Sequence, residues 1–131
     1  DLTETGSTLR RNGLKIVDTV LTSTTRLVAN RESWADAEKR RAMEEIRTLL
    51  LGVIEARGRV LLSMNVPKAK LEAVVVALPA MKRPTVNPLY GSGDFEVTTV
   101  ADKATVNVLI PQLKAAGAED ILEMPISKIV R

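Results

Sequence analysis

The spacing of apolar residues changes at Gly58, and this change limits the folds that the chain can adopt. Before Gly58, apolar side chains recur every three or four residues, which is the period of an amphipathic α-helix. After it, every second residue from Val60 to Val66 is apolar, which is the period of a strand with one buried face. We therefore predict a long helix over residues 34–57 that ends at Gly58 and is followed directly by a strand.

The residues before this helix fall into two stretches. Residues 3–13 are polar and contain two glycines, which predicts a loop that runs into a short helix ending at Gly13. Residues 14–29 are rich in aliphatic and β-branched side chains, so we predict an extended stretch that begins as a strand and breaks near its middle. The sequence Ser33-Trp34-Ala35-Asp36 matches an acidic variant of the capping box and predicts that the long helix begins there.

Five further elements are predicted beyond the first strand. They are a helix over residues 67–79, strands over 84–89 and 95–100 joined by a turn, a helix over 102–117 and a strand over 121–124. The order from Gly58 is therefore β-α-β-β-α-β, in which two helices cover one face of a four-stranded antiparallel sheet. The predicted fold class is α+β, with a ferredoxin-like domain over residues 58–131 that is preceded by a separate segment, residues 1–57.

The composition excludes several kinds of site. The chain has no cysteine and no histidine, which excludes disulfides, thiolate metal clusters and catalysis by a histidine or cysteine nucleophile. No apolar run reaches the roughly 18 residues that span a bilayer, so we expect a soluble, cytoplasmic protein without a membrane partner. The first residue is Asp1 rather than methionine, and we expect the chain to be a fragment of a longer protein.

RNA binding is a competing function, because the split βαβ arrangement also carries an RNA-recognition module. That module stacks bases on two or three aromatic side chains of its sheet, whereas the aromatic residues here are Trp34, Tyr90 and Phe95 and form no such platform. The net charge of +3 is dispersed except for the basic run at residues 39–41, which we interpret as a solvated helix face. We therefore expect no nucleic-acid partner.

Several short motifs occur along the chain in a definite order. Residues 1–9, Asp-Leu-Thr-Glu-Thr-Gly-Ser-Thr-Leu, and then Asn12-Gly13-Leu14 resemble the phosphoribosyl-pyrophosphate loop of ATP phosphoribosyltransferases. Later motifs resemble successive landmarks of the C-terminal regulatory domain in the long form of that family: Met64-Asn65-Val66-Pro67, Leu78-Pro79, Arg83-Pro84-Thr85-Val86, Pro88-Leu89, residues 113–118 and residues 125–130. The ordered set covers essentially the whole chain.

The resemblance implies that the chain is the C-terminal portion of such an enzyme. Members of this family transfer phosphoribosyl from phosphoribosyl pyrophosphate to N1 of ATP, with Mg²⁺, in the first step of histidine biosynthesis. Residues 1–57 would then close the catalytic part, and residues 58–131 would form the regulatory domain through which histidine inhibits a homo-oligomeric enzyme. Most of the catalytic lobes, including the ATP site, would precede Asp1, so we assign no catalytic residue and expect no activity from this chain alone.

The resemblance places the ribose 5-phosphate of phosphoribosyl pyrophosphate against Thr5, Gly6, Ser7 and Thr8, and a ribose hydroxyl against Asp1. The physical chemistry of the loop agrees, because a glycine-bearing loop at a helix N-terminus presents backbone N–H groups and a positive dipole end to a phosphate. The alternative is a flexible N-terminal turn that is rich in helix-capping residues. We favour the phosphate loop.

The resemblance also places the inhibitor histidine near Asn65, Met81, Thr85 and Asp120. Some relatives carry an acid at the position of Asn65, and the neutral amide loses a charge-assisted hydrogen bond that is worth about 1 kcal/mol more than a neutral one. Asn65 could equally cap the helix that follows Pro67, and Thr85 could cap the edge of the sheet. Asp120 is expected to contribute mainly backbone groups.

A second class of function is a stand-alone ferredoxin-like domain that senses a ligand or mediates oligomerisation without catalysis. This interpretation leaves the loop at residues 1–9 unexplained. A gene that extends well upstream of Asp1 would favour the transferase, whereas a gene that begins near Asp1 would favour the stand-alone domain.

Overall fold

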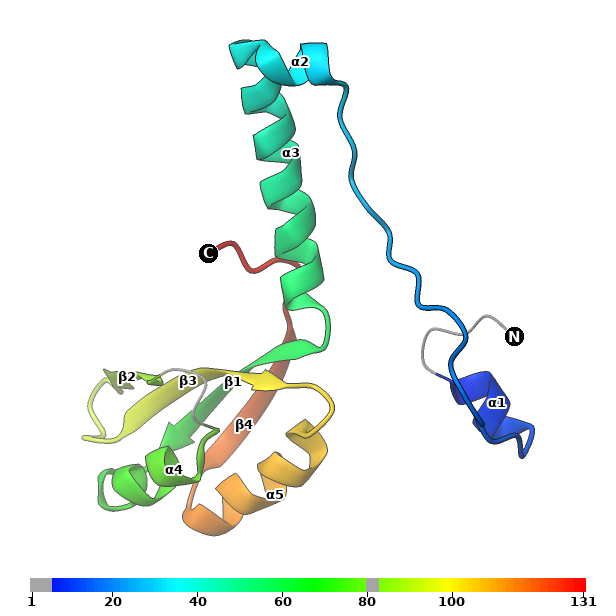
Figure 1. Ribbon diagram of the computed structural model, residues 1–131. Helices are drawn as coiled ribbons and strands as arrows, with labels where there is room; N and C mark the ends of the chain where they lie inside the picture. The colour runs from blue at the N-terminus through cyan, green and yellow to red at the C-terminus, as the bar shows by residue number, and fades with distance from the viewer. Residues whose placement is uncertain (1–5, 80–82) are drawn as a thin grey trace.

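The computed structural model describes residues 6–79 and 83–131 (Figure 1). Its elements are α1 (Ser7–Arg11), α2 (Arg31–Ala35), α3 (Ala37–Ala56), β1 (Arg59–Val66), the 3-10 turn η1 (Lys68–Lys70), α4 (Leu71–Ala77), β2 (Thr85–Pro88), β3 (Phe95–Asp102), α5 (Val106–Ala116) and β4 (Glu119–Pro125). Among the helices in these ranges, none combines the length and the apolar character that crossing a membrane requires.

Within the described residues, four strands form one antiparallel sheet in the order β2-β3-β1-β4. The helices α4 and α5 lie together on one side of this sheet (Figure 1). A hairpin joins β2 to β3, and it is closed by the Leu89 N–H, which donates to the Asp94 carbonyl oxygen at 2.8 Å. The predicted α+β class and the β-α-β-β-α-β order are therefore confirmed.

The core lies between the sheet and these two helices. Alternate residues of β1 face it, and each is at most 3% exposed: Val60, Leu62, Met64 and Val66. They belong to one buried cluster that also contains Val74, Val97, Ala101, Val106, Leu109, Leu113 and Ala118. This pattern follows from the strand period of two, which turns successive side chains to opposite sides of the sheet.

The other side of the sheet is not covered by α4 and α5, and we call it the open face. Because paired residues on antiparallel strands point to the same side, the registers assign its members: Leu61, Ser63 and Asn65 from β1, Glu96, Thr98 and Val100 from β3, Thr85 and Asn87 from β2, and Leu122 and Met124 from β4. The open face therefore mixes polar and apolar side chains, whereas the core side of β1 is wholly apolar.

The long helix begins at a different cap from the one predicted. Asp36 is the N-cap of α3, and its carboxylate accepts the N–H groups of Glu38 and Lys39 at 3.0 Å each. Ser33 lies inside the short helix α2, which is capped by Asn30. The capping-box prediction was wrong because Asp36 has an extended backbone, with φ −73° and ψ 122°, which ends α2 and suits an N-cap.

The prediction of a strand within residues 14–29 is not met by the structure. These residues belong to no helix or strand, and Val17 and Val20 are almost completely exposed. A strand is stabilised by a neighbour that pairs with its backbone N–H and carbonyl groups, and no such neighbour is present among the described residues. The stretch instead runs as an extended connection from α1 to α2 (Figure 1).

The helix α5 begins later than predicted. β3 continues through Asp102, whose carboxylate accepts the Ala104 N–H at 2.8 Å in the turn before the helix. Asp102 therefore shapes this turn rather than capping α5, whose N-cap Thr105 makes no side-chain cap bond. Pro111 lies inside α5, and Gly117 ends the helix in the left-handed conformation with φ 107°.

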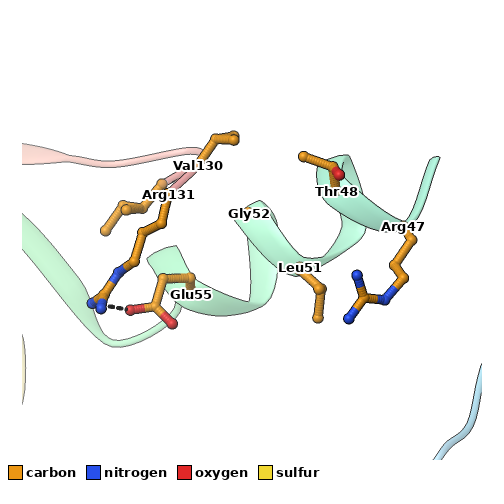
Figure 2. Close-up of a pocket in the computed structure, with 8 residues that line it drawn as sticks. Arg47, Thr48, Leu51, Gly52, Glu55, Val130 and Arg131 are labelled. Atoms are coloured by element: carbon orange, nitrogen blue, oxygen red, sulfur yellow. Dashed lines mark hydrogen bonds and ion pairs between the residues drawn. The ribbon is translucent and has the colours of Figure 1, made fainter. Parts of the chain in front are cut away.

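The C-terminal residues pack on α3 at a glycine. The Ile129 N–H donates to the Gly52 carbonyl oxygen at 2.9 Å, and a Cβ on Gly52 would lie 3.1 Å from Val130 Cγ2. Arg131 Nη2 donates to Glu55 Oε1 at 2.6 Å and forms an ion pair with it, which Figure 2 shows. These contacts join the end of the chain to the last turns of α3.

Gly52→Leu is expected to displace the C-terminal residues from α3, because the leucine side chain would occupy the space of Val130 and of the Ile129 carbonyl oxygen. Losing one hydrogen bond and its packing costs about 1 to 2 kcal/mol, so the Ile129 amide should exchange its hydrogen roughly tenfold faster. Hydrogen exchange measures this rate. Val53→Leu is the control, and equal exchange rates in the two variants would contradict the packing described here.

Candidate functional site

The N-terminal loop is described from Gly6 onward, so Asp1 and Thr5 lie outside the described residues. Gly6 precedes α1 as its N-cap, with φ 66° and ψ 8°. Residues with a Cβ adopt this left-handed conformation only at a cost of roughly 1 to 2 kcal/mol. The Gly6 carbonyl oxygen accepts the Arg10 N–H at 3.0 Å, which begins the helix. The left-handed backbone conformation therefore explains why the predicted phosphate loop has a glycine at position 6.

Ser7 and Thr8 form the first turn of α1, next to Gly6, and both are exposed. The Thr8 carbonyl oxygen accepts the backbone N–H of Asn12 at 3.2 Å and its side-chain Nδ2 at 2.9 Å, which closes this short helix. The structure thus brings Gly6, Ser7 and Thr8 together at a helix N-terminus, a position that favours an anion. Their contact with a phosphate stays a prediction.

Asn65 and Asp120 lie side by side on neighbouring strands. The Asn65 Nδ2 donates to the Asp120 Oδ2 at 2.9 Å, although the two residues are 55 positions apart in sequence. The β1–β4 register shifts between Ser63 and Asn65, and Asp120 lies at this shift with φ 47°. In the turn η1, which follows Pro67, the Lys68 N–H donates to Asp94 Oδ1 at 3.1 Å and not to the Asn65 side chain. Asn65 is therefore not a helix cap, and Asp120 is engaged through its carboxylate.

Thr85 is the first residue of β2, at the edge of the sheet, and it is exposed. It pairs with Thr98 of β3, which in turn pairs with Ser63 of β1, so the three hydroxyl side chains form one row across the open face. Met81 lies outside the described residues. The structure therefore places Thr85 on the same face as Asn65, with β3 between their strands.

Glu96 lies on β3, between the strands that carry Thr85 and Asn65. It was not predicted as a site residue. Its Oε1 accepts a hydrogen bond from Ser63 Oγ at 2.7 Å and a longer one from Thr98 Oγ1 at 3.4 Å. Its Oε2 accepts one from Asn87 Nδ2 at 3.5 Å. The hydrogen bond from Ser63, followed by that from Asn87, holds the pKa of Glu96 below its usual value, while burial works weakly in the opposite direction.

A signal for this cluster was present in the sequence. The positions of β1 and β3 that alternate with the core residues are polar in part, namely Ser63 and Asn65 in β1 and Glu96 and Thr98 in β3. The periodicity could assign these four residues to one face. It could not show that Glu96 lies opposite Asn65, because that depends on the register of two strands more than 25 residues apart.

A shallow hollow lies elsewhere, between α3 and the C-terminal residues (Figure 2). Thr48, Leu51 and Gly52 line it from α3, and Ile129 and Val130 line it from the other side. None of the predicted site residues lines this hollow. We therefore locate the candidate site on the polar part of the open face and at the N-terminus of α1, not in the hollow.

Comparison with known proteins covers both segments of the chain. The family described as "HisG, C-terminal domain" matches residues 56–128, and the family described as "ATP phosphoribosyltransferase" matches residues 1–52. The chain belongs to the ATP phosphoribosyltransferase family. The two matches meet within the last turns of α3, just before the predicted division between residues 57 and 58.

Relatives from several bacteria support this membership. The chain is 54% identical over 130 residues to an ATP phosphoribosyltransferase of Solibacter usitatus and 46% identical to one of Pelotomaculum thermopropionicum, with 99% of the chain covered in each case. It spans 45% of the length of each of these two relatives. A crystal structure of Arabidopsis thaliana PII bound to citrate aligns with 56% of the chain, at 19% identity and a TM-score of 0.48, and covers 82% of that protein.

The family resemblance implies Mg²⁺ as the metal of the complete enzyme. Mg²⁺ prefers an octahedral set of oxygen ligands, commonly with one or two carboxylates. The described part of the loop contributes Gly6, Ser7 and Thr8, which carry no carboxylate. Across the described residues, no group of three or more acidic side chains is placed to hold a metal ion. The described residues therefore do not fit a metal site.

Proposed function

We propose that the protein containing this chain transfers phosphoribosyl from phosphoribosyl pyrophosphate to N1 of ATP, in the first step of histidine biosynthesis. The observation that carries this proposal is the match of 99% of the chain, at 54% identity, to a relative named ATP phosphoribosyltransferase. Because the chain spans 45% of that relative, the activity is assigned to the complete protein. ATP, phosphoribosyl pyrophosphate and Mg²⁺ are its proposed substrates and metal, and the cytoplasm is its proposed location.

In this proposal, the segment around Gly6 binds the ribose 5-phosphate. Gly6, Ser7 and Thr8 surround the N-terminus of α1, where backbone N–H groups and the helix dipole stabilise a negative charge. Asp1 and Thr5 complete the proposed site. Phosphoribosyl transfer depends on positioning both substrates and neutralising the leaving pyrophosphate, so this loop contributes binding and orientation rather than the whole of catalysis.

The sheet domain is the proposed regulatory part. Histidine would bind on the open face near Asn65, Thr85 and Asp120 and would contact two copies of the domain. Met81, outside the described residues, is a further proposed contact. Two facts support this location: Asn65 and Asp120 are joined by a hydrogen bond, and Thr85 lies on the same face with no hydrogen bond to its hydroxyl from the described residues. The protein is accordingly proposed to be a homo-oligomer that histidine inhibits.

The test compares the complete protein with residues 1–131 alone. The complete protein should convert ATP and phosphoribosyl pyrophosphate to the N1 adduct with release of pyrophosphate, whereas residues 1–131 should show no turnover. Gly6→Ala in the complete protein should raise the KM for phosphoribosyl pyrophosphate several-fold, because about 1 to 2 kcal/mol of backbone strain opposes the loop conformation.

The control for this variant is Gly91→Ala, which introduces the same strain in the β2–β3 turn, where φ is 77° and no atom lies within 4 Å of the added Cβ. It should leave the KM for phosphoribosyl pyrophosphate unchanged. Absence of N1 adduct from the complete protein would refute the proposed activity. Turnover by residues 1–131 alone would instead refute the division of labour between the two parts.

A further inference from the structure

Glu96 is the carboxylate at the centre of the polar part of the open face. It lies directly opposite Asn65 on β1 and directly opposite Asn87 on β2, and its neighbour two residues along β3 is Thr98, which lies opposite Thr85. Thr85 and Asn65 are two strands and two residues apart, so with about 4.8 Å between strands and about 3.3 Å per residue they are separated by about 12 Å. The Glu96 side chain stands in the interval between them.

The hydrogen bonds to Glu96 fix its carboxylate but do not neutralise it. Its three partners, Ser63, Asn87 and Thr98, are all uncharged donors. The ion pairs found among the described residues join Arg41 to Glu45 and join Glu55 to two arginines, and none involves Glu96. A half-buried, oriented carboxylate whose partners are neutral attracts a cation from outside the domain.

Asn65 cannot supply a negative charge for a cationic ligand, because its amide is neutral and is already hydrogen-bonded. Its Nδ2 donates to Asp120, so its amide joins β1 to β4 at the side of Glu96 away from β2. The Asp120 carboxylate already accepts this bond at an exposed edge. Glu96 is therefore the acid that accepts a short hydrogen bond, 2.7 Å from Ser63, and that lies in the middle of the row formed with Asn65 and Asn87.

We propose that Glu96 binds the ammonium group of the amino-acid ligand and thereby sets the specificity of the open face for amino acids over other imidazole compounds. The proposal rests on the proposed regulatory function. At neutral pH an amino group is protonated, whereas an imidazole with a pKa near 6.5 is largely neutral, so the ammonium is the cation that a fixed carboxylate selects. The Thr85 hydroxyl lies one strand away and could accept or donate a further bond to the ligand.

The test is a thermodynamic cycle in the complete protein that removes the Glu96 carboxylate and the ammonium group of the ligand separately and together. Calorimetry would measure the affinity for histidine and for imidazolepropionate, which lacks the ammonium group, in the parent protein and in Glu96→Gln. Glutamine keeps the size of the side chain and an oxygen that can accept the Ser63 bond. In the parent protein we expect histidine to bind at least tenfold more tightly than imidazolepropionate, because imidazolepropionate lacks the whole charge-assisted bond to Glu96 and the loss of such a bond lowers affinity by about tenfold or more.

Glu96→Gln should weaken histidine binding about tenfold and leave imidazolepropionate nearly unaffected, so that the preference for histidine disappears. Glu123→Gln is the matched control, because it removes an exposed acid from β4 on the opposite side of the sheet and should change neither affinity. If Glu96→Gln does not fold, Ser63→Ala tests the same point, because it keeps the charge but removes the 2.7 Å bond and should reduce the preference several-fold.

The outcomes separate the failure of this inference from that of the regulatory proposal. If the parent protein binds histidine but Glu96→Gln weakens both ligands equally, or neither, Glu96 has no role in recognising the ammonium group and the inference is overturned. If the parent protein binds no histidine, the regulatory proposal is overturned and the role of Glu96 with it. A retained preference in Ser63→Ala would show that orientation of the carboxylate is unimportant, which also contradicts the inference.

Discussion

Leu62→Ala is expected to lower the free energy of unfolding of the sheet domain by about 2 to 5 kcal/mol. Leu62 is completely buried in the middle of β1, between the sheet and the helices α4 and α5. Truncation removes three carbons from a close-packed core and leaves a cavity that the surrounding backbone cannot fill. For a domain of this size, 1 kcal/mol corresponds to about 4 to 8 °C in Tm, so the loss should exceed 8 °C.

The matched control is Leu122→Ala on the neighbouring strand β4. Leu122 has the same side chain but is 57% exposed on the open face, so its truncation should change the Tm by no more than a few degrees. Thermal unfolding followed by far-ultraviolet circular dichroism measures both. Tryptophan fluorescence would not report on the sheet, because Trp34 belongs to α2. Equal Tm values for the two variants would contradict the assignment of core and open face.

Added histidine is expected to shift the protein toward a larger oligomer. If each ligand contacts two copies of the domain, it binds the associated state more tightly, and mass action then favours that state by the difference in affinity. Sedimentation with and without millimolar histidine measures the shift, and calorimetry measures the binding. Thr85→Ala should weaken both several-fold, since losing one hydrogen bond typically costs about 1 kcal/mol.

Asn65→Asp is the variant with the larger and more informative effect. In the structure the Asn65 amide donates to the Asp120 carboxylate at 2.9 Å, so an aspartate at position 65 would replace this bond with two carboxylates in contact. Like charges at this distance repel, and a cationic ligand placed beside them relieves the repulsion. Histidine should therefore bind more tightly and produce a larger change in mass, while the ligand-free domain becomes less stable.

Asn107→Asp is the control for this variant, because it makes the same substitution on the exposed surface of α5. It should alter neither histidine binding nor the oligomeric state. If Asn65→Asp destabilises the domain without tightening histidine binding, the cation of the ligand does not lie at this edge. If the parent protein shows neither heat nor a change in mass, the roles proposed for Asn65, Thr85 and Asp120 are wrong.

The order of elements after Gly58 and the members of the core could be predicted from the sequence. Val60, Leu62, Met64 and Val66 alternate with less apolar residues, and such a pattern can bury one side only as a strand. Gly58 and Gly117 end their helices in left-handed conformations, as their positions predicted. These features are set by residues close to one another in sequence, so local periodicity and backbone preference are sufficient to determine them.

Residues 14–29 show where composition alone was insufficient. Their β-branched and aliphatic side chains favour an extended backbone, but pairing into a sheet requires a partner strand, and the described residues provide none. The predicted cap of α3 was also wrong, because Asn30, Ser33 and Asp36 are all residue types that favour an N-cap. The extended backbone at Asp36 ends α2 and makes Asp36 the cap of α3, while Asn30 caps α2.

The candidate site was decided by the tertiary structure. Asn65 and Thr85 could be singled out from motifs, but the bond between Asn65 and Asp120, the central position of Glu96 and the packing of Ile129 on Gly52 could not. Each of these contacts joins residues 33 or more positions apart. The period of a strand assigns a side chain to one side of the sheet, whereas strand order and register decide which side chains meet there.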